Sequence, residues 1–240
     1  MEKVRNHAAV TLIHPVEHSK DLVFGIYDDA YPVTAFTGHY TPVGGNANGH
    51  SSPLDTIIRE LHEELQDEHI SEETIGAIAN LKDKRSYALN ESKKIGENAV
   101  SLNLRRAFRD AVIGSLTPLR DYFVNVDGSK INSKDKNRKF IYSFFVAGID
   151  NALFYEIADE LGKGLELRNE GLTRVIGESE LKRGSFRGAW GAAAIVGDIL
   201  RLDIPEYDWI HVEPLGNIRN SYQDYKKDFS YTIDPELKPT

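Results

Sequence analysis

Two kinds of hydrophobic pattern alternate along the chain and predict its secondary structure. Short runs of apolar, aromatic and β-branched residues are typical of β-strands, whereas apolar residues that recur every three or four positions are typical of helices. The first pattern predicts strands at 7–14, 22–27, 121–126, 140–146 and 172–176. The second predicts helices at 53–67, over most of 71–116 with breaks near Gly96 and Gly114, at 151–161 and at 191–202, with a helical turn at 178–181.

These elements indicate one mixed α/β domain of the α+β kind. Strands and helices alternate, but no clear strand–helix–strand unit of a parallel sheet is present. The first two strands predict a hairpin, and the two aromatic strands in the second half predict another across a polar loop. We expect a single domain over 1–240 with a helical insertion at 71–116. A C-terminal extension follows at 203–240, and its tail from Pro214 has no clear pattern.

Composition excludes several classes of protein. The chain of 240 residues contains no cysteine, so disulfides, thiolate metal sites and a catalytic thiol are ruled out. No apolar run approaches the roughly 20 residues that cross a bilayer, and the N-terminal residues lack a signal-peptide pattern. We therefore expect a cytoplasmic protein without a membrane partner. The formal net charge of −8 disfavours binding to a nucleic-acid backbone.

Two groups of basic residues depart from this acidic balance. One group lies on a predicted helix, and the other lies in the polar loop before the strand at 140–146. A solvated helix face and a hairpin loop explain both groups, so we expect no nucleic-acid partner. The two groups are Arg105, Arg106 and Arg109, and Lys134, Lys136, Arg138 and Lys139.

The helix predicted at 53–67 is the most informative segment. Ser52 fits the N-cap, Pro53 the first helical position and Asp55 the third, a pattern that resembles a capping box. The apolar residues of this helix form a single stripe, which must face the core. That stripe consists of Leu54, Ile57, Ile58, Leu61 and Leu65.

Three glutamates lie on a second face of the same helix. Glu60, Glu63 and Glu64 are spaced i, i+3 and i+4, so their carboxylates crowd together with no basic neighbour expected at the matching spacing. A divalent cation would relieve the repulsion, and hard oxygen ligands suit Mg²⁺ or Mn²⁺. Such a cation binds phosphate oxygens and activates water. The alternative interpretation is a surface helix with a charged, solvated face.

A glycine-rich segment precedes this helix. Gly44, Gly45 and Gly49 fall within residues 44–49. Because glycine lets the backbone turn sharply and approach a ligand closely, we expect a loop here. A glycine carbonyl from this loop could supply the metal with a further oxygen.

The order of these residues resembles the Nudix box. That motif runs Gly, five residues, Glu, seven residues, Arg-Glu-apolar-any-Glu-Glu, any residue, Gly and an apolar residue. Here the match begins at Gly45, and its core runs from Arg59 to Glu64. Such a core occurs by chance in about one chain in a thousand of this length. Strands before and after the box extend the resemblance to roughly 6–70 and 118–202.

The resemblance to the Nudix family implies a fold and a reaction. The implied fold is a mixed β-sheet between helices. The implied reaction is the Mg²⁺-dependent attack of water on a phosphoanhydride bond, with Mn²⁺ as a substitute metal. The implied substrate is a nucleoside diphosphate linked to another moiety, as in ADP-ribose or a nucleotide sugar. Many relatives are dimers, so a homodimer is also implied.

The resemblance also assigns roles to residues of the box. Glu60, Glu63 and Glu64 match the glutamates that bind the metal, and Arg59 matches the arginine that orients them. The carbonyl of Gly44, just before the box, often joins the metal shell in the family. Arg59, Glu60 and Glu63 are therefore the catalytic candidates within the box.

Two further residues are candidates for substrate binding. Gly45 begins the box and is expected close to the substrate. Tyr40 is the candidate for stacking on a base among four aromatic residues that precede the box. The alternative is that these residues belong to the core, as aromatic residues beside strands usually do. The four are Tyr27, Tyr31, Phe36 and Tyr40.

The chain departs from the motif at three positions. Ser51 replaces the first glutamate, Gln66 the closing glycine and Asp67 the closing apolar residue. Because one carboxylate is missing, we expect another acid to act as general base or fourth metal ligand. Our candidate is Glu170, which precedes a glycine and a predicted strand.

Three hypotheses therefore remain open. The first is an active hydrolase. The second is a catalytically weak or inactive Nudix-like domain that binds nucleotides in a regulatory role. The third is a structural or interaction protein built around the helices at 71–116. We expect that insertion to pack over the site or to form a dimer contact, because its apolar residues need a partner.

Overall fold

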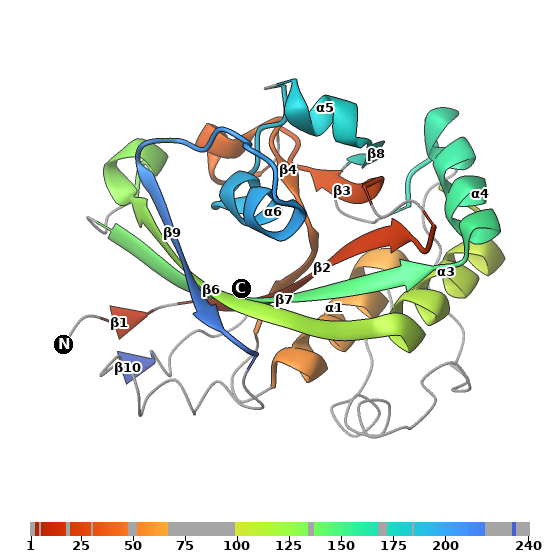
Figure 1. Cartoon of the computed structure of the whole chain (residues 1–240), viewed down its shortest axis with the longest axis horizontal. Coiled ribbons are helices and arrows are strands. Elements are labelled where there is room, and N and C mark those ends of the chain that lie inside the picture. The colour runs from red at the N-terminus through yellow and green to blue at the C-terminus, as the bar shows by residue number, and fades with distance from the viewer. Residues whose placement is uncertain are drawn as a thin grey trace.

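The computed structural model consists of a mixed β-sheet with helices on both faces (Figure 1). This confirms the predicted α+β class. The structure describes residues 3–4, 6–17, 20–29, 31–47, 52–66, 99–133, 137–167, 172–183, 185–218 and 232–233.

Eight strands form the main sheet, and two short strands form a separate parallel pair. Within the main sheet the strands follow the order β4-β3-β2-β7-β6-β9, while β5 pairs with β2 and β8 pairs with β3. The strands are β1 (Lys3–Val4), β2 (Asn6–Pro15), β3 (Leu22–Ile26), β4 (Tyr40–Thr41), β5 (Val43–Asn46), β6 (Leu116–Asp127), β7 (Asn137–Ile149), β8 (Leu172–Ile176), β9 (Ile210–Gly216) and β10 (Thr232–Ile233).

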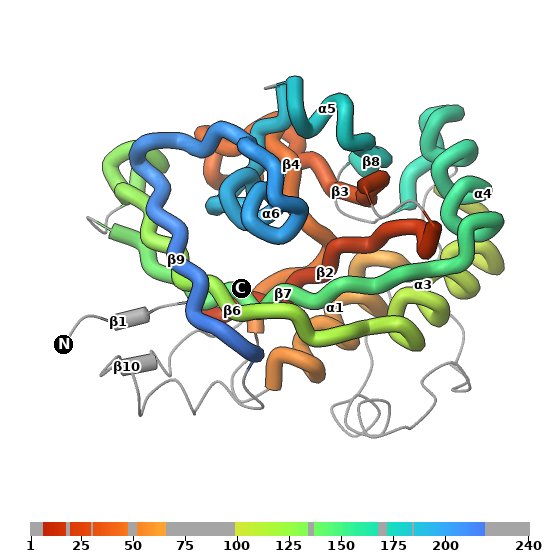
Figure 2. Tube along the Cα trace, viewed as in Figure 1, coloured from red at the N-terminus to blue at the C-terminus, as the bar shows by residue number. Residues whose placement is uncertain are grey.

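The centre of the sheet joins segments that lie far apart in the sequence. Strand β2 runs parallel to β7 from the pair Asn6–Phe140 to the pair Pro15–Ile149. Figure 2 shows these two strands side by side, β2 in red and β7 in green. The predicted hairpin of β2 and β3 is present, but only Ile13 and Val23 are paired, because β5 takes the other half of the same edge of β2.

Helices cover the sheet as two separate layers, each with its own core. The layer with α1 buries Ile57, Ile58 and Leu61, and the layer with α6 buries Ile195 and Val196. The helices are α1 (Pro53–Gln66), α3 (Leu102–Ser115), α4 (Asn151–Gly162), α5 (Glu178–Lys182) and α6 (Ala192–Leu200), with 3₁₀ turns η1 (Thr34–Phe36) and η3 (Gly128–Ile131). Among the described helices, none is long and apolar enough to cross a membrane.

Helix α1 begins as the sequence predicts. The backbone N–H of Asp55 donates to the Ser52 hydroxyl, and the Ser52 backbone N–H donates to the Asp55 carboxylate. This reciprocal pair is a capping box with aspartate in the third position. The apolar stripe also faces the core, with Ile57 and Leu65 fully buried.

Several strands differ from the prediction, and the short strands β1, β4 and β10 were not predicted. Residues 43–46, expected as part of a loop, form strand β5 against β2. Strand β6 begins at Leu116 rather than at residue 121, directly after α3. Strand β9 was not predicted, because its alternation of Ile210, Val212 and exposed polar residues is short and interrupted by Pro214.

The basic group on α3 corrects another expectation. Arg105 and Arg109 are 4% and 2% exposed, so this face of α3 is not solvated. The Arg105 guanidinium donates to the backbone oxygens of Leu65 and Val100, at 3.1 and 2.8 Å. Arginine can be buried in this way because backbone carbonyls accept its hydrogen bonds. Helix α3, which lies within the predicted insertion, therefore packs against α1 and binds its C-terminal end through Arg105.

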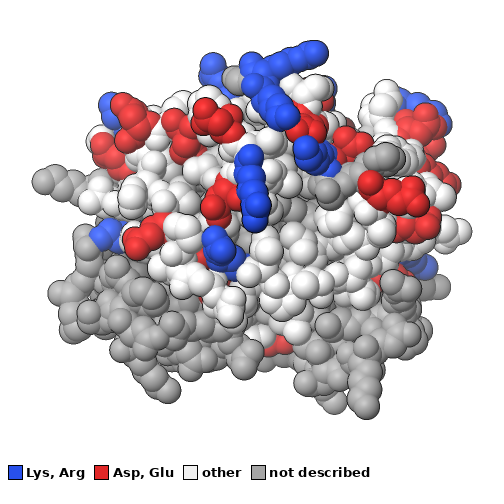
Figure 3. Space-filling model, viewed as in Figure 1, with Lys and Arg blue, Asp and Glu red and all other residues white. Residues whose placement is uncertain are grey.

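Two further parts of the prediction lie outside the described residues. Residues 67–98 carry most of the insertion at 71–116, and residues 219–231 and 234–240 carry most of the C-terminal tail. On the face seen in Figure 3, the described acidic and basic side chains are interspersed rather than separated.

Candidate functional site

Glu60 and Glu64 of α1 lie against the two glycines of β5. The backbone N–H of Gly44 donates to the Glu64 carboxylate at 3.2 Å. A side chain at Gly45 would overlap the Glu60 carboxylate. Glycine is therefore required here for close approach, and not for the loop that the sequence suggested.

Gly44 is constrained by the sheet as well as by the helix. Its φ of +134° favours glycine, and a Cβ at this position would overlap the backbone oxygen of Ala9. Strand β5 can lie this close to both β2 and α1 only because it has no side chains here. The glycine pair thus fixes the distance between α1 and the sheet.

Arg59 joins two of the three glutamates. Its guanidinium forms ion pairs with Glu60 and with Glu63, and it donates to the backbone oxygen of Asn46 at 2.6 Å. The expectation that the glutamates lack a basic neighbour is therefore wrong. Arg59 lies four residues before Glu63, which is the spacing at which helical side chains meet.

Burial changes the protonation of Glu60. Removal from solvent raises its pKa, Arg59 opposes this shift, and the charges of Glu64 and Glu63 add to it, which brings the pKa to about 8. The Glu60 side chain is 13% exposed and that of Glu63 is 32% exposed. Without a further cation, Glu60 can therefore hold a proton at neutral pH.

The fit of a divalent metal can be judged from charge and donor type. Arg59 pairs with Glu60 and Glu63, and Glu64 accepts a hydrogen bond from the Gly44 N–H, so three carboxylates lie close together. Carboxylate oxygens are also the donors that Mg²⁺ prefers. However, among the described residues no three acidic or histidine side chains are arranged around one point. The donors suit a divalent cation, whereas the geometry shown is that of an arginine-bridged pair.

His62 and Arg109 connect this cluster to α3. Arg109 donates to the His62 ring nitrogen Nδ1 at 3.3 Å. Burial and the nearby Arg109 charge lower the pKa of His62 to about 3, so its ring is neutral at pH 7. A neutral imidazole accepts this bond, and His62 therefore adds no positive charge beside Glu63.

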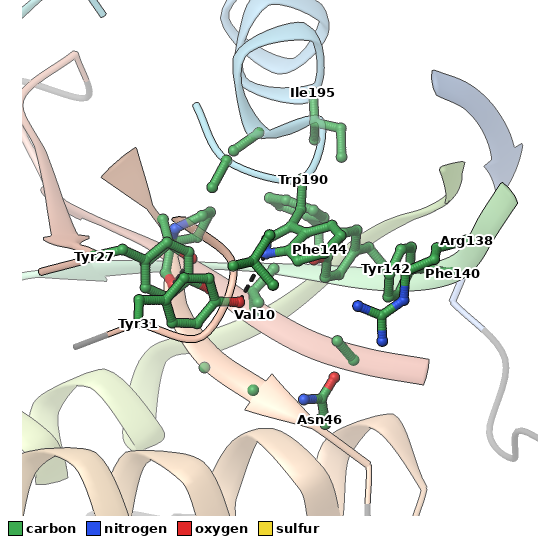
Figure 4. A pocket seen from close by; sticks show the side chains of 18 of the residues that line it. Val10, Tyr27, Tyr31, Asn46, Arg138, Phe140, Tyr142, Phe144, Trp190 and Ile195 are labelled. Atoms are coloured by element: carbon green, nitrogen blue, oxygen red, sulfur yellow. Dashed lines mark hydrogen bonds between the residues drawn. The ribbon is translucent and has the colours of Figure 1, made fainter. Parts of the chain in front are cut away.

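A cavity of about 390 Å³ lies on the other side of β5 from α1 (Figure 4). Its volume falls in the range of small-molecule sites. Gly44, Gly45 and Asn46 line one side, so only glycine backbone separates this part of the cavity from the glutamates. The opposite walls come from β7 and from the residues before and within α6, and include Phe140, Tyr142, Phe144, Ala189, Trp190, Ala192 and Ile195.

Tyrosine and tryptophan side chains form one end of the cavity. The rings of Tyr27 and Tyr31 are stacked with centroids 3.6 Å apart. The Trp190 indole N–H donates to the Tyr31 hydroxyl at 2.9 Å. Burial, followed by the neighbouring tyrosines, raises the pKa of Tyr27 well above its ordinary value, so its hydroxyl stays protonated. This end can accept a planar group and form hydrogen bonds with it.

Tyr40 lies outside this cavity. Its ring stacks on Phe186, with centroids 5.0 Å apart, and its hydroxyl accepts a hydrogen bond from Arg174. Of the aromatic residues before the box, Tyr27 and Tyr31 line the cavity instead. The structure thus brings together Gly44, Gly45, Arg59, Glu60, Glu63 and Glu64, whereas Ser51 and Glu170 lie outside the described residues.

Sequence reasoning missed two residues of the cavity. Arg138 was assigned to a solvated loop, but it lies in β7 and lines the cavity. Trp190 precedes α6 with a φ of +54°, which no sequence pattern indicated. An arginine two residues before an aromatic strand face was the one signal available for Arg138.

Comparison with protein-family models gives no match for this chain, and comparison with curated proteins gives none either.

Proposed function

We propose that this protein is a Mg²⁺-dependent hydrolase that cuts a phosphoanhydride bond of a nucleoside diphosphate linked to another moiety. One observation supports the proposal most. The Glu60 and Glu64 carboxylates lie directly behind the glycines that line an aromatic cavity, so these two acidic groups and a site for a planar group share one boundary.

The residues that would hold the metal are those of the box. Glu60, Glu63 and Glu64 would supply carboxylate oxygens, and Gly44 would supply a backbone oxygen. A bound Mg²⁺ or Mn²⁺ would neutralise charge on the phosphate oxygens and lower the pKa of a water molecule.

The other polar contacts of the site position these groups. Arg59 restrains Glu60 and Glu63, and the Gly44 N–H restrains Glu64, so the carboxylates have defined orientations. Glu60 has a pKa near 8 without a further cation, which lets it exchange a proton near neutral pH. In the proposal, Glu170 is a further base or ligand from the later part of the chain.

The aromatic cavity would bind the nucleoside part of the substrate. Its walls are rings and glycine backbone, which can enclose a base and exclude water from the adjacent phosphates. The proposal therefore assigns nucleoside binding to β7 and the start of α6, and hydrolysis of the phosphoanhydride bond to α1. The proposal includes a cytoplasmic location and a homodimer, and light scattering of the purified protein tests the dimer.

A second candidate function is nucleotide binding without turnover. The observation that favours it is the position of Arg59, which already pairs with two of the three carboxylates. Together with the replacement of a motif glutamate by Ser51, this arrangement would let the cluster persist without a metal. Ligand-induced thermal stabilisation without product release would favour this second function.

The test is a substrate panel with Mg²⁺ and with Mn²⁺. The panel contains nucleoside triphosphates, ADP-ribose, dinucleotides and nucleotide sugars, and release of phosphate or nucleoside monophosphate is measured. We expect metal-dependent release from at least one diphosphate-linked substrate. No release from any substrate with either metal would contradict the proposal.

Substitutions in the acidic cluster test the same proposal. We expect Glu63→Gln and Glu64→Gln each to lower turnover at least tenfold and to weaken Mg²⁺ binding, because each removes a charged donor while keeping the side-chain shape. The control is Glu156→Gln on α4, which is exposed and should leave both quantities unchanged. Wild-type turnover in either cluster variant would exclude that carboxylate from the site.

A further inference from the structure

The cavity has two chemically different ends. Tyr27 and Tyr31 lie at one end, and Arg138 lies at the other, on the side of Asn46 (Figure 4). The first end offers tyrosine rings and hydroxyl groups, whereas the second offers a guanidinium and a side-chain amide beside the rings of Phe140 and Trp190. A ligand that spans the cavity therefore meets an aromatic surface first and a positive charge at the far end.

Arg138 is held by rings rather than by acids. Its Cζ atom lies 5.6 Å from the centroid of the Trp190 ring and 5.8 Å from that of the Phe140 ring. Within the part of the chain that the structure describes, its guanidinium forms no ion pair with an acidic side chain, and it also interacts electrostatically with the Tyr142 hydroxyl. The cation–π contacts stabilise the charge over its flat face, and none of the described residues accepts a hydrogen bond from the N–H donors at the guanidinium edge.

This arrangement favours an anionic ligand. Arg138 is half-buried in a mostly aromatic wall, where a charge-assisted hydrogen bond is stronger than in water. A phosphate can accept two N–H bonds from one guanidinium, and it would also balance the buried positive charge. The same charge repels a cation, so the rings around Arg138 do not suit a quaternary ammonium ligand.

We propose that Arg138 is a specificity-determining residue, which selects nucleoside phosphates over neutral nucleosides by binding a phosphate group while the base occupies the aromatic end. This inference rests on the proposed function, since it takes the ligand to be a nucleotide. It does not require hydrolysis, because Arg138 lies in the cavity and not in the acidic cluster of α1.

Equilibrium binding without metal tests this role. Isothermal titration calorimetry in EDTA compares adenosine, guanosine, cytidine and uridine with their 5′-monophosphates. We expect at least one monophosphate to bind the wild-type protein about tenfold or more tightly than its nucleoside. In Arg138→Gln the ratio should fall below about threefold, because the monophosphate loses affinity and the nucleoside does not.

The control is Lys130→Gln in the same hairpin. Lys130 is exposed and does not line the cavity, so its variant loses the same charge and should keep the wild-type ratio. Arg138→Lys keeps the charge without the planar guanidinium group and should give an intermediate affinity ratio.

If Arg138→Gln does not fold, the wild-type protein still gives a test. Salt should weaken monophosphate binding and leave nucleoside binding unchanged.

The inference is overturned by any of three results. These are no binding by the wild-type protein, equal affinities for nucleoside and monophosphate, or an unchanged ratio in Arg138→Gln. The experiment is separate from the test of hydrolysis. If the wild-type protein prefers the monophosphate and Arg138→Gln loses that preference, but no substrate is hydrolysed, the hydrolase proposal fails and Arg138 remains a phosphate ligand. If a substrate is hydrolysed but Arg138→Gln keeps the wild-type affinity ratio, the hydrolase proposal stands and the role of Arg138 is excluded.

Discussion

At the scale of single residues, one arginine pairs with two members of the acidic cluster. Helical spacing was enough to predict that Glu60, Glu63 and Glu64 share a face. It did not predict how close β5 would come, and the approach of Gly45 is what buries Glu60. The shift in the pKa of Glu60 therefore depends on a tertiary contact, which sequence periodicity does not contain.

The protonation of Glu60 predicts how stability depends on pH. Because its folded pKa of about 8 lies above the ordinary value of 4.5, the folded state binds the additional proton. The contribution of this proton to the free energy of unfolding is complete below pH 4.5 and is lost as pH rises through 8. In metal-free buffer, the urea concentration at the midpoint of unfolding should therefore decrease as the pH is raised from 6 to 9.

A substitution isolates this effect. Glu60→Gln keeps the shape of the protonated side chain and cannot ionise, so its urea midpoint should change less over the same pH range than that of the wild-type protein. Glu156→Gln serves as the control, since that exposed variant should follow the wild-type curve. Parallel curves for Glu60→Gln and wild type would show that Glu60 ionises normally.

At the scale of elements, the contact between β5 and α1 was only partly predictable. The capping pair and the apolar stripe gave the start and the buried face of α1, because both are local patterns. The glycine pair was mistaken for a loop, since two glycines in sequence favour turns more often than strands. Pairing with β2 overrides that preference and makes residues 43–46 a strand.

Three glycine substitutions test the role of this contact. Gly44→Ala should lower the free energy of unfolding by about 1–3 kcal/mol, because its φ is strained and its Cβ overlaps backbone. Gly45→Ala should cost less stability, because the flexible Glu60 side chain can shift, but it should lower turnover at least tenfold. Gly162→Ala on α4, which meets no atom within 4 Å, should leave turnover unchanged and should not lower the free energy of unfolding. Urea denaturation and product release measure both effects. Wild-type turnover in Gly45→Ala would separate Glu60 from catalysis.

At the scale of the whole molecule, the cavity is assembled from distant parts of the chain. Tyr27, Arg138 and Trp190 come from three segments that only the folded sheet brings together. The α+β class was predictable from the alternating patterns and is confirmed. The cavity was not, because long-range pairing such as that of β2 with β7 leaves no signal in local hydrophobic periodicity.

The same long-range folding brings the later part of the chain towards α1. Leu167 is fully buried in the core that contains Leu65, and the Val100 N–H donates to the backbone oxygen of Glu166. We expect Glu170→Gln to reduce turnover at least tenfold across a range of Mg²⁺ concentrations without changing the melting temperature. Unchanged kinetics would exclude Glu170 as the base and point to another acid.

The parallel pairing of β2 with β7 has a consequence for biosynthesis. A ribosome that adds 5–20 residues per second completes β7 on the order of ten seconds after β2. Until then, Ile13 lacks one of its two strand neighbours, and α1 has no complete sheet to pack against. Such a nascent chain exposes apolar strand edges and depends on slow, non-local closure. A chaperone that shields this N-terminal segment should therefore raise the yield of folded protein.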